Sequence, residues 1–128
     1  MANGLPAMKS MTKEELQRRT KQYGVDVIAL TRELPRSPAA DHVTGQLIRS
    51  GTAVGANYRA SCRAKSRADF IAKMGTVEEE ADESVYWLEV LLDSKLIAHT
   101  SVERLLNEGQ QLVKIVVASI NTARGGAR

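Results

Sequence analysis

The sequence contains one cysteine, two histidines and no long hydrophobic run. A single cysteine, Cys62, excludes an intrachain disulfide and a zinc site made of several thiolates, and it is typical of a protein of the reducing cytoplasm. A membrane-spanning helix needs about 20 apolar residues, whereas the most apolar stretch, residues 85–92, is interrupted by Glu89. The first residues carry Lys9 but no apolar segment, so we expect no signal peptide. These features predict a cytoplasmic protein without a membrane partner.

Aromatic residues and prolines are scarce as well, at 4% of the chain and 3 residues respectively. Strands are enriched in aromatic and β-branched side chains, and proline is poorly tolerated inside helices. The chain is instead rich in Ala, Leu, Val, Glu and Arg, most of which favour helices. A length of 128 residues fits one domain that can bury its own core. The composition therefore predicts a single all-α domain.

Motifs for catalysis and for nucleotide or metal binding are absent from the sequence. There is no Gly-x-Ser-x-Gly nucleophile motif and no glycine-rich phosphate loop that ends in Lys and Ser or Thr. The acidic run 78–83 suggests a metal site, but di-iron bundles use Glu-x-x-His pairs, and no such pair occurs here. We therefore expect a protein that is not an enzyme and that holds neither a cofactor nor a metal.

Four segments show the hydrophobic periodicity of a helix. Their expected ranges are about 13–33, 38–60, 67–95 and 101–123, which together form one bundle at 12–124 between flexible tails at 1–11 and 125–128. Thr12, Ser37 and Ser66 stand at N-cap positions, and Thr100 or Ser101 stands at that of the last helix. Because the links between the helices are short, the sequence predicts an antiparallel, up-and-down four-helix bundle.

Two glycines, Gly51 and Gly55, fall inside the second expected helix. Each glycine in a helix interior costs about 1 kcal/mol relative to alanine. Close approach of a neighbouring helix would explain both glycines. A break of the helix near Gly55 would explain them too, and the sequence leaves the two explanations open.

Basic and acidic residues are separated along the chain. Residues 43–67 carry basic side chains and no acidic one, whereas residues 75–93 carry seven acidic side chains and no basic one. The net charge of +3 hides this separation. A basic surface that meets phosphate would explain it, as would two patches that meet each other on neighbouring subunits. Glu80 flanks the apolar stripe of its helix, so we expect it to pair with Arg49 or Arg59 at an edge of the bundle.

The basic residues near the junction of the second and third helices are the best candidates for a ligand site. Arginine can bind phosphate through two parallel hydrogen bonds, and a group of such side chains can neutralise several phosphates. Tyr58 lies nearby, but it belongs to the apolar stripe of its helix, so the core is favoured over a role in base stacking. The candidate residues for RNA or DNA are Arg59, Arg63, Lys65 and Arg67, joined by Arg18, Arg19 and Lys21 from the first helix.

Apolar residues occupy two faces of the third expected helix. The core stripe runs from Phe70 to Leu91 in steps of four and three, whereas Tyr86 and Val90 fall near the opposite face and Trp87 on a flank. A second apolar face predicts a homo-oligomer. The candidate interface residues are Glu79, Glu83, Tyr86, Trp87 and Val90.

Three stretches, QLIRSGTAVGANY at 46–58, RAKSRADFIAKM at 63–74 and EEADESVYWLE at 79–89, resemble the bacterial four helix bundle protein family. Proteins of that family are often encoded by intervening sequences in 23S ribosomal RNA genes. The resemblance implies an antiparallel bundle that assembles into a ring-like homopentamer. A related branch, the accessory protein of diversity-generating retroelements, binds nucleic acid and a reverse transcriptase.

The chain departs from the family pattern at two points. Gly55 stands where proline is usual, and Arg59 with the two residues after it replaces a common acidic Ala-Glu-Gly, which makes the junction more basic. Asn57 is the best-matched polar position, and we expect it to fix the corner between the second and third helices through hydrogen bonds to the backbone. The expected function is that of a non-enzymatic homo-oligomer that binds RNA or DNA by charge and shape. The alternative is a self-assembling structural or protein-partner adaptor with no nucleic-acid role.

Overall fold

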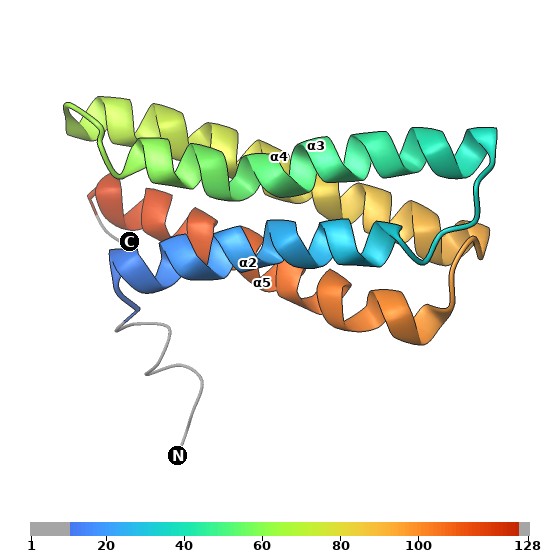
Figure 1. Ribbon diagram of the computed structural model, residues 1–128. Coiled ribbons are helices and arrows are strands. Elements are labelled where there is room, and N and C mark those ends of the chain that lie inside the picture. Colours follow the sequence, from blue (N-terminus) through green and yellow to red (C-terminus); the bar gives the residue numbers. More distant parts are fainter. Residues whose placement is uncertain (1–10, 126–128) are drawn as a thin grey trace, which may run out of the picture.

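The helices run alternately up and down, and each packs against the next along the chain (Figure 1). The structure, a computed structural model, describes residues 11–125. Within this range the elements are α2 (Lys13–Thr31), α3 (Pro38–Ser61), α4 (Arg67–Ser94) and α5 (His99–Ala123), with no strand. α5 returns to contact α2, so α2 and α4 lie at diagonally opposite corners. The predicted antiparallel four-helix bundle is confirmed. The tails expected at 1–11 and 125–128 lie outside the described residues, except for residues 11 and 125.

Side chains at the predicted positions cap three of the four helices. The hydroxyl of Thr12 accepts a hydrogen bond from the backbone N–H of Glu15, and the Glu15 carboxylate accepts the backbone N–H of Thr12 in return. Ser37 and Ser66 accept hydrogen bonds from the backbone N–H groups three residues further on. These caps satisfy backbone donors that would otherwise lack a partner in the first turn.

The ends of two helices differ from the sequence-based expectation. The predicted cap of the last helix is wrong, because α5 begins at His99 after Ala98, and Ala98 has no side chain that can cap. Ser101 instead lies in the first turn, where its N–H bonds to the Ala98 carbonyl. α2 ends at Thr31 rather than near 33, since the N–H groups of the next residues reach back only three positions before Pro35 stops the helix.

Glycines bring α2 and α3 into close contact, and α3 continues unbroken through Gly55. A Cβ atom added to Gly51 would lie 2.9 Å from Cγ2 of Val27, and one added to Gly55 would lie 3.2 Å from the backbone of Thr20. From the other side, a Cβ on Gly24 would lie 3.3 Å from the Cα of Thr52. Close helix approach therefore explains the glycines, and the helix break does not occur.

All four helices contribute to one hydrophobic core. Val27, Leu47, Leu88 and Leu112, one from each helix, are fully buried. The core contains one buried polar pair between α2 and α4, in which the hydroxyls of Tyr23 and Ser84 lie 2.7 Å apart. Tyr58 is also buried, as its position on the apolar stripe predicted. None of the helices between residues 11 and 125 combines the length and apolarity that crossing a bilayer requires.

Candidate nucleic-acid interface

The seven basic side chains predicted to contact nucleic acid occupy three places in the bundle. One, Arg19, lies between α2 and α5. Another group lines a hollow between α2 and α3, which we call the α2–α3 groove: Arg18, Lys21 and Arg59. The last group lies between the end of α3 and the first residue of α4, and we call it the basic corner: Arg63, Lys65 and Arg67.

Arg19 forms a bidentate salt bridge and is partly buried. Its Nε donates to Oε2 of Glu108 at 2.7 Å and its Nη2 to Oε1 of Glu108 at 2.9 Å, while Nη2 also donates to Oε1 of Gln111 at 3.0 Å. Only 26% of the Arg19 side chain is exposed. The hydrogen bond with Glu108 raises the pKa of Arg19 above its usual value, despite partial burial. Arg19 thus ties α2 to α5 and is paired within the subunit.

The backbone of the basic corner is fixed by a short series of hydrogen bonds. After α3 ends, the N–H groups of Arg63 and Ala64 bond back three residues, and Ser66 then caps α4. The N–H of Lys65 donates to Oδ2 of Asp69 at 3.0 Å. Nη1 of Arg67 donates to the carbonyl of Ala123 at 3.4 Å, which joins the corner to the end of α5. The chain therefore presents three exposed cations from a firmly held turn.

The acidic neighbour of the basic corner, Asp69, forms its salt bridge with Lys73 and interacts with Lys65 only through space and through the Lys65 backbone. Oδ1 of Asp69 accepts a hydrogen bond from Nζ of Lys73 at 2.6 Å, and this bond, with the backbone bond from Lys65, lowers the pKa of Asp69. None of the three corner side chains forms a salt bridge in the part of the chain that the structure describes. α2 begins and α5 ends at the same end of the bundle as the basic corner (Figure 1). Two further basic residues, Lys13 and Arg124, therefore lie at this end.

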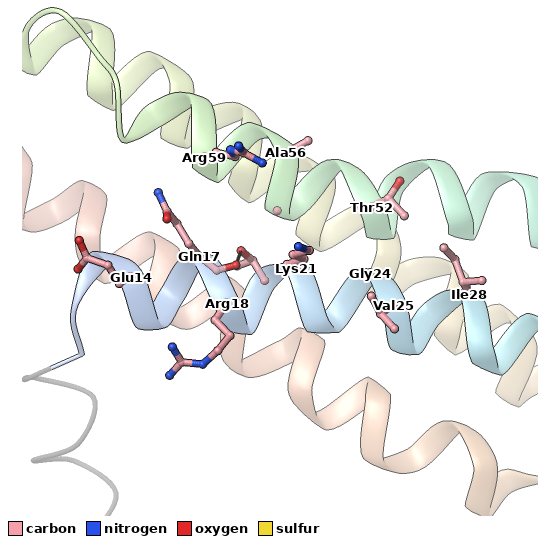
Figure 2. Close-up of a pocket in the computed structure, with 12 residues that line it drawn as sticks. Glu14, Gln17, Arg18, Lys21, Gly24, Val25, Ile28, Thr52, Ala56 and Arg59 are labelled. Atoms are coloured by element: carbon pink, nitrogen blue, oxygen red, sulfur yellow. Dashed lines mark hydrogen bonds between the residues drawn. The ribbon is translucent and has the colours of Figure 1, made fainter.

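The α2–α3 groove combines charge with exposed apolar surface (Figure 2). Its lining includes Gly24 and Gly55, two of the glycines at which the two helices lie close together. Val25 and Ile28 line it from α2 and are 50% and 36% exposed. The candidate residues predicted from the sequence did not include Val25 and Ile28. Both lie outside the apolar stripe of their helix, and this position is the pattern that could have indicated an exposed apolar surface. The groove is therefore an amphipathic surface rather than a purely basic one.

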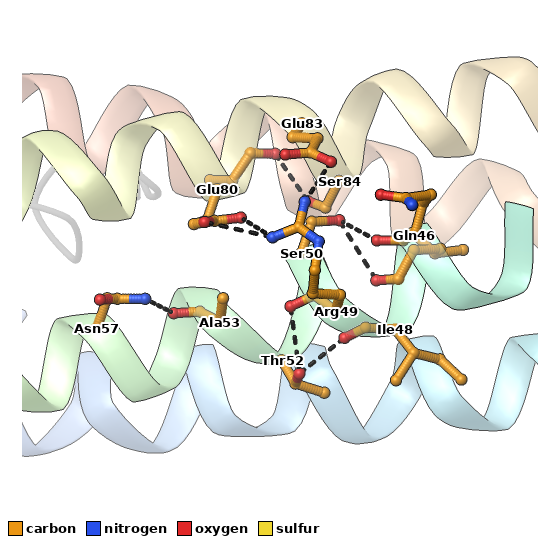
Figure 3. A network of polar contacts seen from close by, with 12 residues as sticks. Gln46, Ile48, Arg49, Ser50, Thr52, Ala53, Asn57, Glu80, Glu83 and Ser84 are labelled. Atoms are coloured by element: carbon orange, nitrogen blue, oxygen red, sulfur yellow. Dashed lines mark hydrogen bonds and ion pairs between the residues drawn. The ribbon is translucent and has the colours of Figure 1, made fainter.

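Part of the acidic segment is neutralised within the same chain by Arg49 of α3 (Figure 3). Nη1 of Arg49 donates to Oε1 of Glu80 at 3.1 Å, which confirms the predicted pair. Nη2 of Arg49 donates to Glu83, whose carboxylate also accepts Nε1 of Trp87 at 3.2 Å. These two hydrogen bonds, the one from Arg49 first, lower the pKa of Glu83. Within residues 11–125, no three acidic, histidine or cysteine side chains are grouped so that they could hold a metal ion.

The five candidate interface residues of α4 point in different directions. Glu79 is exposed, and Tyr86 is exposed over 55% of its surface. Glu83 and Trp87 turn toward α3, where the Trp87 ring lies edge-on to His42 with their centres 5.7 Å apart. Val90 packs partly against the core. Only Glu79 and Tyr86 thus remain on the outer face of the helix.

Asn57 forms a hydrogen bond to the backbone, as expected, but within its own helix. Its Nδ2 donates to the carbonyl of Ala53 at 2.8 Å, four residues earlier in α3 (Figure 3). This bond does not reach the connection to α4. The turn is held instead by Ser66 and Asp69, together with Ser61, whose hydroxyl donates to the carbonyl of Tyr58.

The match to known families covers most of the bundle. Residues 12–118 fit the family model described as 23S rRNA-intervening sequence protein. The chain belongs to this family. The basic corner and the α2–α3 groove both lie inside the matched residues, and the resemblance noted from the sequence is confirmed. The description of the 23S rRNA-intervening sequence protein family refers to ribosomal RNA and names no reaction.

A solved structure supports the same family assignment. It is a crystal structure of a protein of unknown function from the S23 ribosomal protein family of Bacteroides thetaiotaomicron. The two chains are 31% identical and superpose with a TM-score of 0.78, over 86% of this chain and 98% of that one. No curated protein matches the chain.

Proposed function

We propose that this protein is a non-enzymatic, cytoplasmic homo-oligomer that binds the phosphate backbone of RNA or DNA through its basic corner. The observation that carries the proposal is the grouping of three exposed cations, Arg63, Lys65 and Arg67, on a firmly held turn without a salt bridge among the described residues. The family description connects these proteins with the intervening sequence of 23S rRNA, and this connection is consistent with the proposal.

Recognition by this surface depends on charge and shape. Contacts to phosphate position a protein on nucleic acid but carry no direct sequence information. In the described residues the corner is a turn between α3 and α4, two helices that pack against each other, so it presents no separate helix or strand to a nucleic-acid groove. We therefore expect similar affinity for different sequences, with a preference for nucleic-acid shapes that present several phosphates to the corner at once.

Oligomerisation strengthens such a site without adding a new contact. A single corner with three cations binds weakly at physiological salt, whereas several corners held on one assembly engage one polyanion together, and the overall affinity can rise by about 10²–10⁴. The ring-like pentamer that the family resemblance implies would arrange the corners in this way. The exposed apolar side chains of α2 and α4 favour such self-association.

The test compares two charge-reversed variants with the wild type. Arg63→Glu with Lys65→Glu reverses the corner, and Arg104→Glu with Lys114→Glu makes the same change in charge on exposed positions of α5. Binding of a fluorescent RNA duplex and a DNA duplex is measured by anisotropy at low salt. We expect the corner variant to lose measurable binding and the α5 variant to remain within about threefold of the wild type, because local phosphate contacts dominate. Equal losses in both variants would contradict a site at the corner.

The second candidate function is a self-assembling adaptor without a nucleic-acid role. It is favoured by Tyr86, Val25 and Ile28, which are exposed as a protein-binding surface requires. In that case the basic corner would meet acidic α4 of another copy, and the corner variant would dissociate the oligomer. Light scattering separates the two functions, because the nucleic-acid proposal requires that the corner variant keep the molar mass of the wild type.

A further inference from the structure

All the large apolar side chains that are exposed in residues 11–125 lie on two surfaces. Val25 and Ile28 belong to α2 and line the α2–α3 groove, whereas Tyr86 lies on the outer face of α4. Since α2 and α4 occupy diagonal corners of the bundle, the two surfaces face different directions. Single exposed apolar residues need no explanation, but each of these lies within a charged stripe of regular spacing.

The outer face of α4 carries an acidic stripe with one aromatic residue. Its members are spaced by four, three, four, three and four residues, the spacing that keeps side chains on one face of a helix. The stripe spans about 27 Å at 1.5 Å per residue. It consists of Gly75, Glu79, Asp82, Tyr86, Glu89 and Asp93. The five side chains are exposed, and the four carboxylates form no salt bridge within the described chain.

Gly75 in this stripe has no structural explanation within the subunit. A Cβ atom added to it would have no atom of another helix within 4 Å, as at Gly45 and in contrast to the glycines between α2 and α3. Glycine in a helix interior costs about 1 kcal/mol relative to alanine. Close approach of another chain at this point of the outer face would explain the glycine in the way that α2 explains Gly51 and Gly55.

The rim of the groove on α2 carries a basic stripe with the same spacing. Its members are Glu14, Arg18, Lys21, Val25, Ile28 and Arg32. All six are exposed, and the first five line the groove, together with Ala56 and Arg59 from α3. None of its charged members forms a salt bridge in the described residues. The stripe is as long as the acidic one, because both cover 18 residue steps.

The two stripes match when the helices are aligned in parallel. Arg18 then faces Glu79, and Lys21 faces Asp82. One step further along, Val25 faces Tyr86, and at the far end Arg32 faces Asp93. In the antiparallel alignment Glu14 would face Asp93 and Val25 would face Asp82, which places like charges together and an apolar side chain against a carboxylate. The parallel alignment thus forms three pairs of opposite charge and one apolar pair and leaves Ile28 facing Glu89, whereas the antiparallel alignment forms only one pair of opposite charge.

We propose that the acidic stripe of α4 from one copy docks in parallel along the α2–α3 groove of a second copy. This contact rests on the homo-oligomer of the proposed function and specifies the surfaces that form it. It buries Tyr86 against Val25, pairs three of the four carboxylates with cations of the basic stripe, and brings a neighbouring chain close to Gly75. Because the two surfaces differ, the contact is head-to-tail and generates a closed ring or an open chain. The basic corner takes no part in it and stays free for a ligand.

Reversing one charge on each surface tests the contact. Lys21→Glu changes the groove, Asp82→Lys changes the stripe, and a third variant carries both changes. We expect each single variant to weaken self-association about tenfold or more, because it places like charges opposite each other. The double variant restores the opposite-charge pair and should regain the wild-type mass. Lys114→Glu and Glu103→Lys on α5 are the matched controls and should keep the mass of the wild type. Molar mass is measured by light scattering over a concentration series, and helix content by circular dichroism confirms folding.

The outcomes of these measurements distinguish the docking contact from the homo-oligomer itself. Single variants that assemble as well as the wild type would overturn this contact and leave the proposed oligomer standing. Single variants that dissociate without recovery in the double variant would overturn the pairing of the two surfaces. A wild-type mass of 14.0 kDa at every concentration would overturn both this contact and the homo-oligomer of the proposed function. Loss of nucleic-acid binding by the corner variant, with its mass unchanged, would leave the docking contact unaffected.

Discussion

Replacement of Gly109 by alanine tests how tightly the core is packed. A Cβ atom at this position of α5 would lie 2.6 Å from Oη of Tyr23 and 3.0 Å from Cγ2 of Val85. The tyrosine cannot move aside at low cost, because only 1% of it is exposed and its hydroxyl is hydrogen-bonded to Ser84 at 2.7 Å. The substitution therefore requires α5 to shift, the hydrogen bond between Tyr23 and Ser84 to break, or both.

Three terms of known size determine the result. Alanine gains about 1 kcal/mol over glycine in helix propensity. Overpacking of a core costs about 1–3 kcal/mol, and loss of the hydrogen bond between Tyr23 and Ser84 costs about 1 kcal/mol. The sum predicts that Gly109→Ala lowers the free energy of unfolding by about 1–3 kcal/mol. Urea titration followed by circular dichroism measures this difference.

A double-mutant cycle with Tyr23→Phe separates the clash between the new methyl group and the Tyr23 hydroxyl from any destabilisation of α5 that does not involve Tyr23. Phenylalanine removes the oxygen nearest to the new methyl group, and it costs about 1 kcal/mol by itself, since Ser84 still donates to the carbonyl of Ala81 at 2.7 Å. The double variant should be more stable than additivity predicts by about 1–2 kcal/mol. Additive effects, or stabilisation by Gly109→Ala alone, would refute the assigned packing around Tyr23.

Other predictions follow from single contacts. Gly45→Ala should raise the free energy of unfolding by about 0.5–1 kcal/mol, because a Cβ there meets no atom within 4 Å; a loss of stability in urea would contradict it. Burial, with a smaller contribution from the charge of Glu108, raises the pKa of Tyr23 from 10.0 to about 12. The unfolded chain therefore loses this proton first, and stability should fall by about 2 kcal/mol between pH 10 and pH 12, a fall that Tyr23→Phe reduces. Arg19→Ala should cost about 1 kcal/mol of stability but leave nucleic-acid affinity within about twofold; a loss equal to that of the corner variant would show that Arg19 contacts the ligand.

Local signals in the sequence predicted the helices well. Thr12, Ser37 and Ser66 cap helices because a short polar side chain reaches the nearest free N–H groups whatever the rest of the fold does. The apolar periodicity predicted the four-helix bundle, and the glycines of α3 predicted its close approach to a neighbour. Where local sequence offered a second choice, as at Thr100 and Ser101, the prediction failed, because α5 starts two residues earlier than expected, without a side-chain cap.

The candidate site could be predicted only in part, because the direction of each side chain depends on neighbours distant in sequence. Arg18 and Arg19 are adjacent, yet a rotation of about 100° along the helix leaves the first exposed and places the second against Glu108, 89 residues away. Glu83 was likewise predicted to contact another subunit, but in the structure it accepts a hydrogen bond from Arg49 of α3. Composition alone could not separate paired charges from free ones, and it is the free ones that define the corner and the groove.

The most direct measurement of the central claim is the salt dependence of nucleic-acid binding by the wild-type oligomer. If three or more corner cations contact phosphates, the logarithm of the binding constant for a DNA duplex should fall linearly with the logarithm of the salt concentration, with a slope of about −3 or steeper. The corner variant Arg63→Glu with Lys65→Glu should lose this dependence along with the binding. A folded, oligomeric wild type that binds neither RNA nor DNA at low salt, or that binds with a slope near zero, would contradict the account.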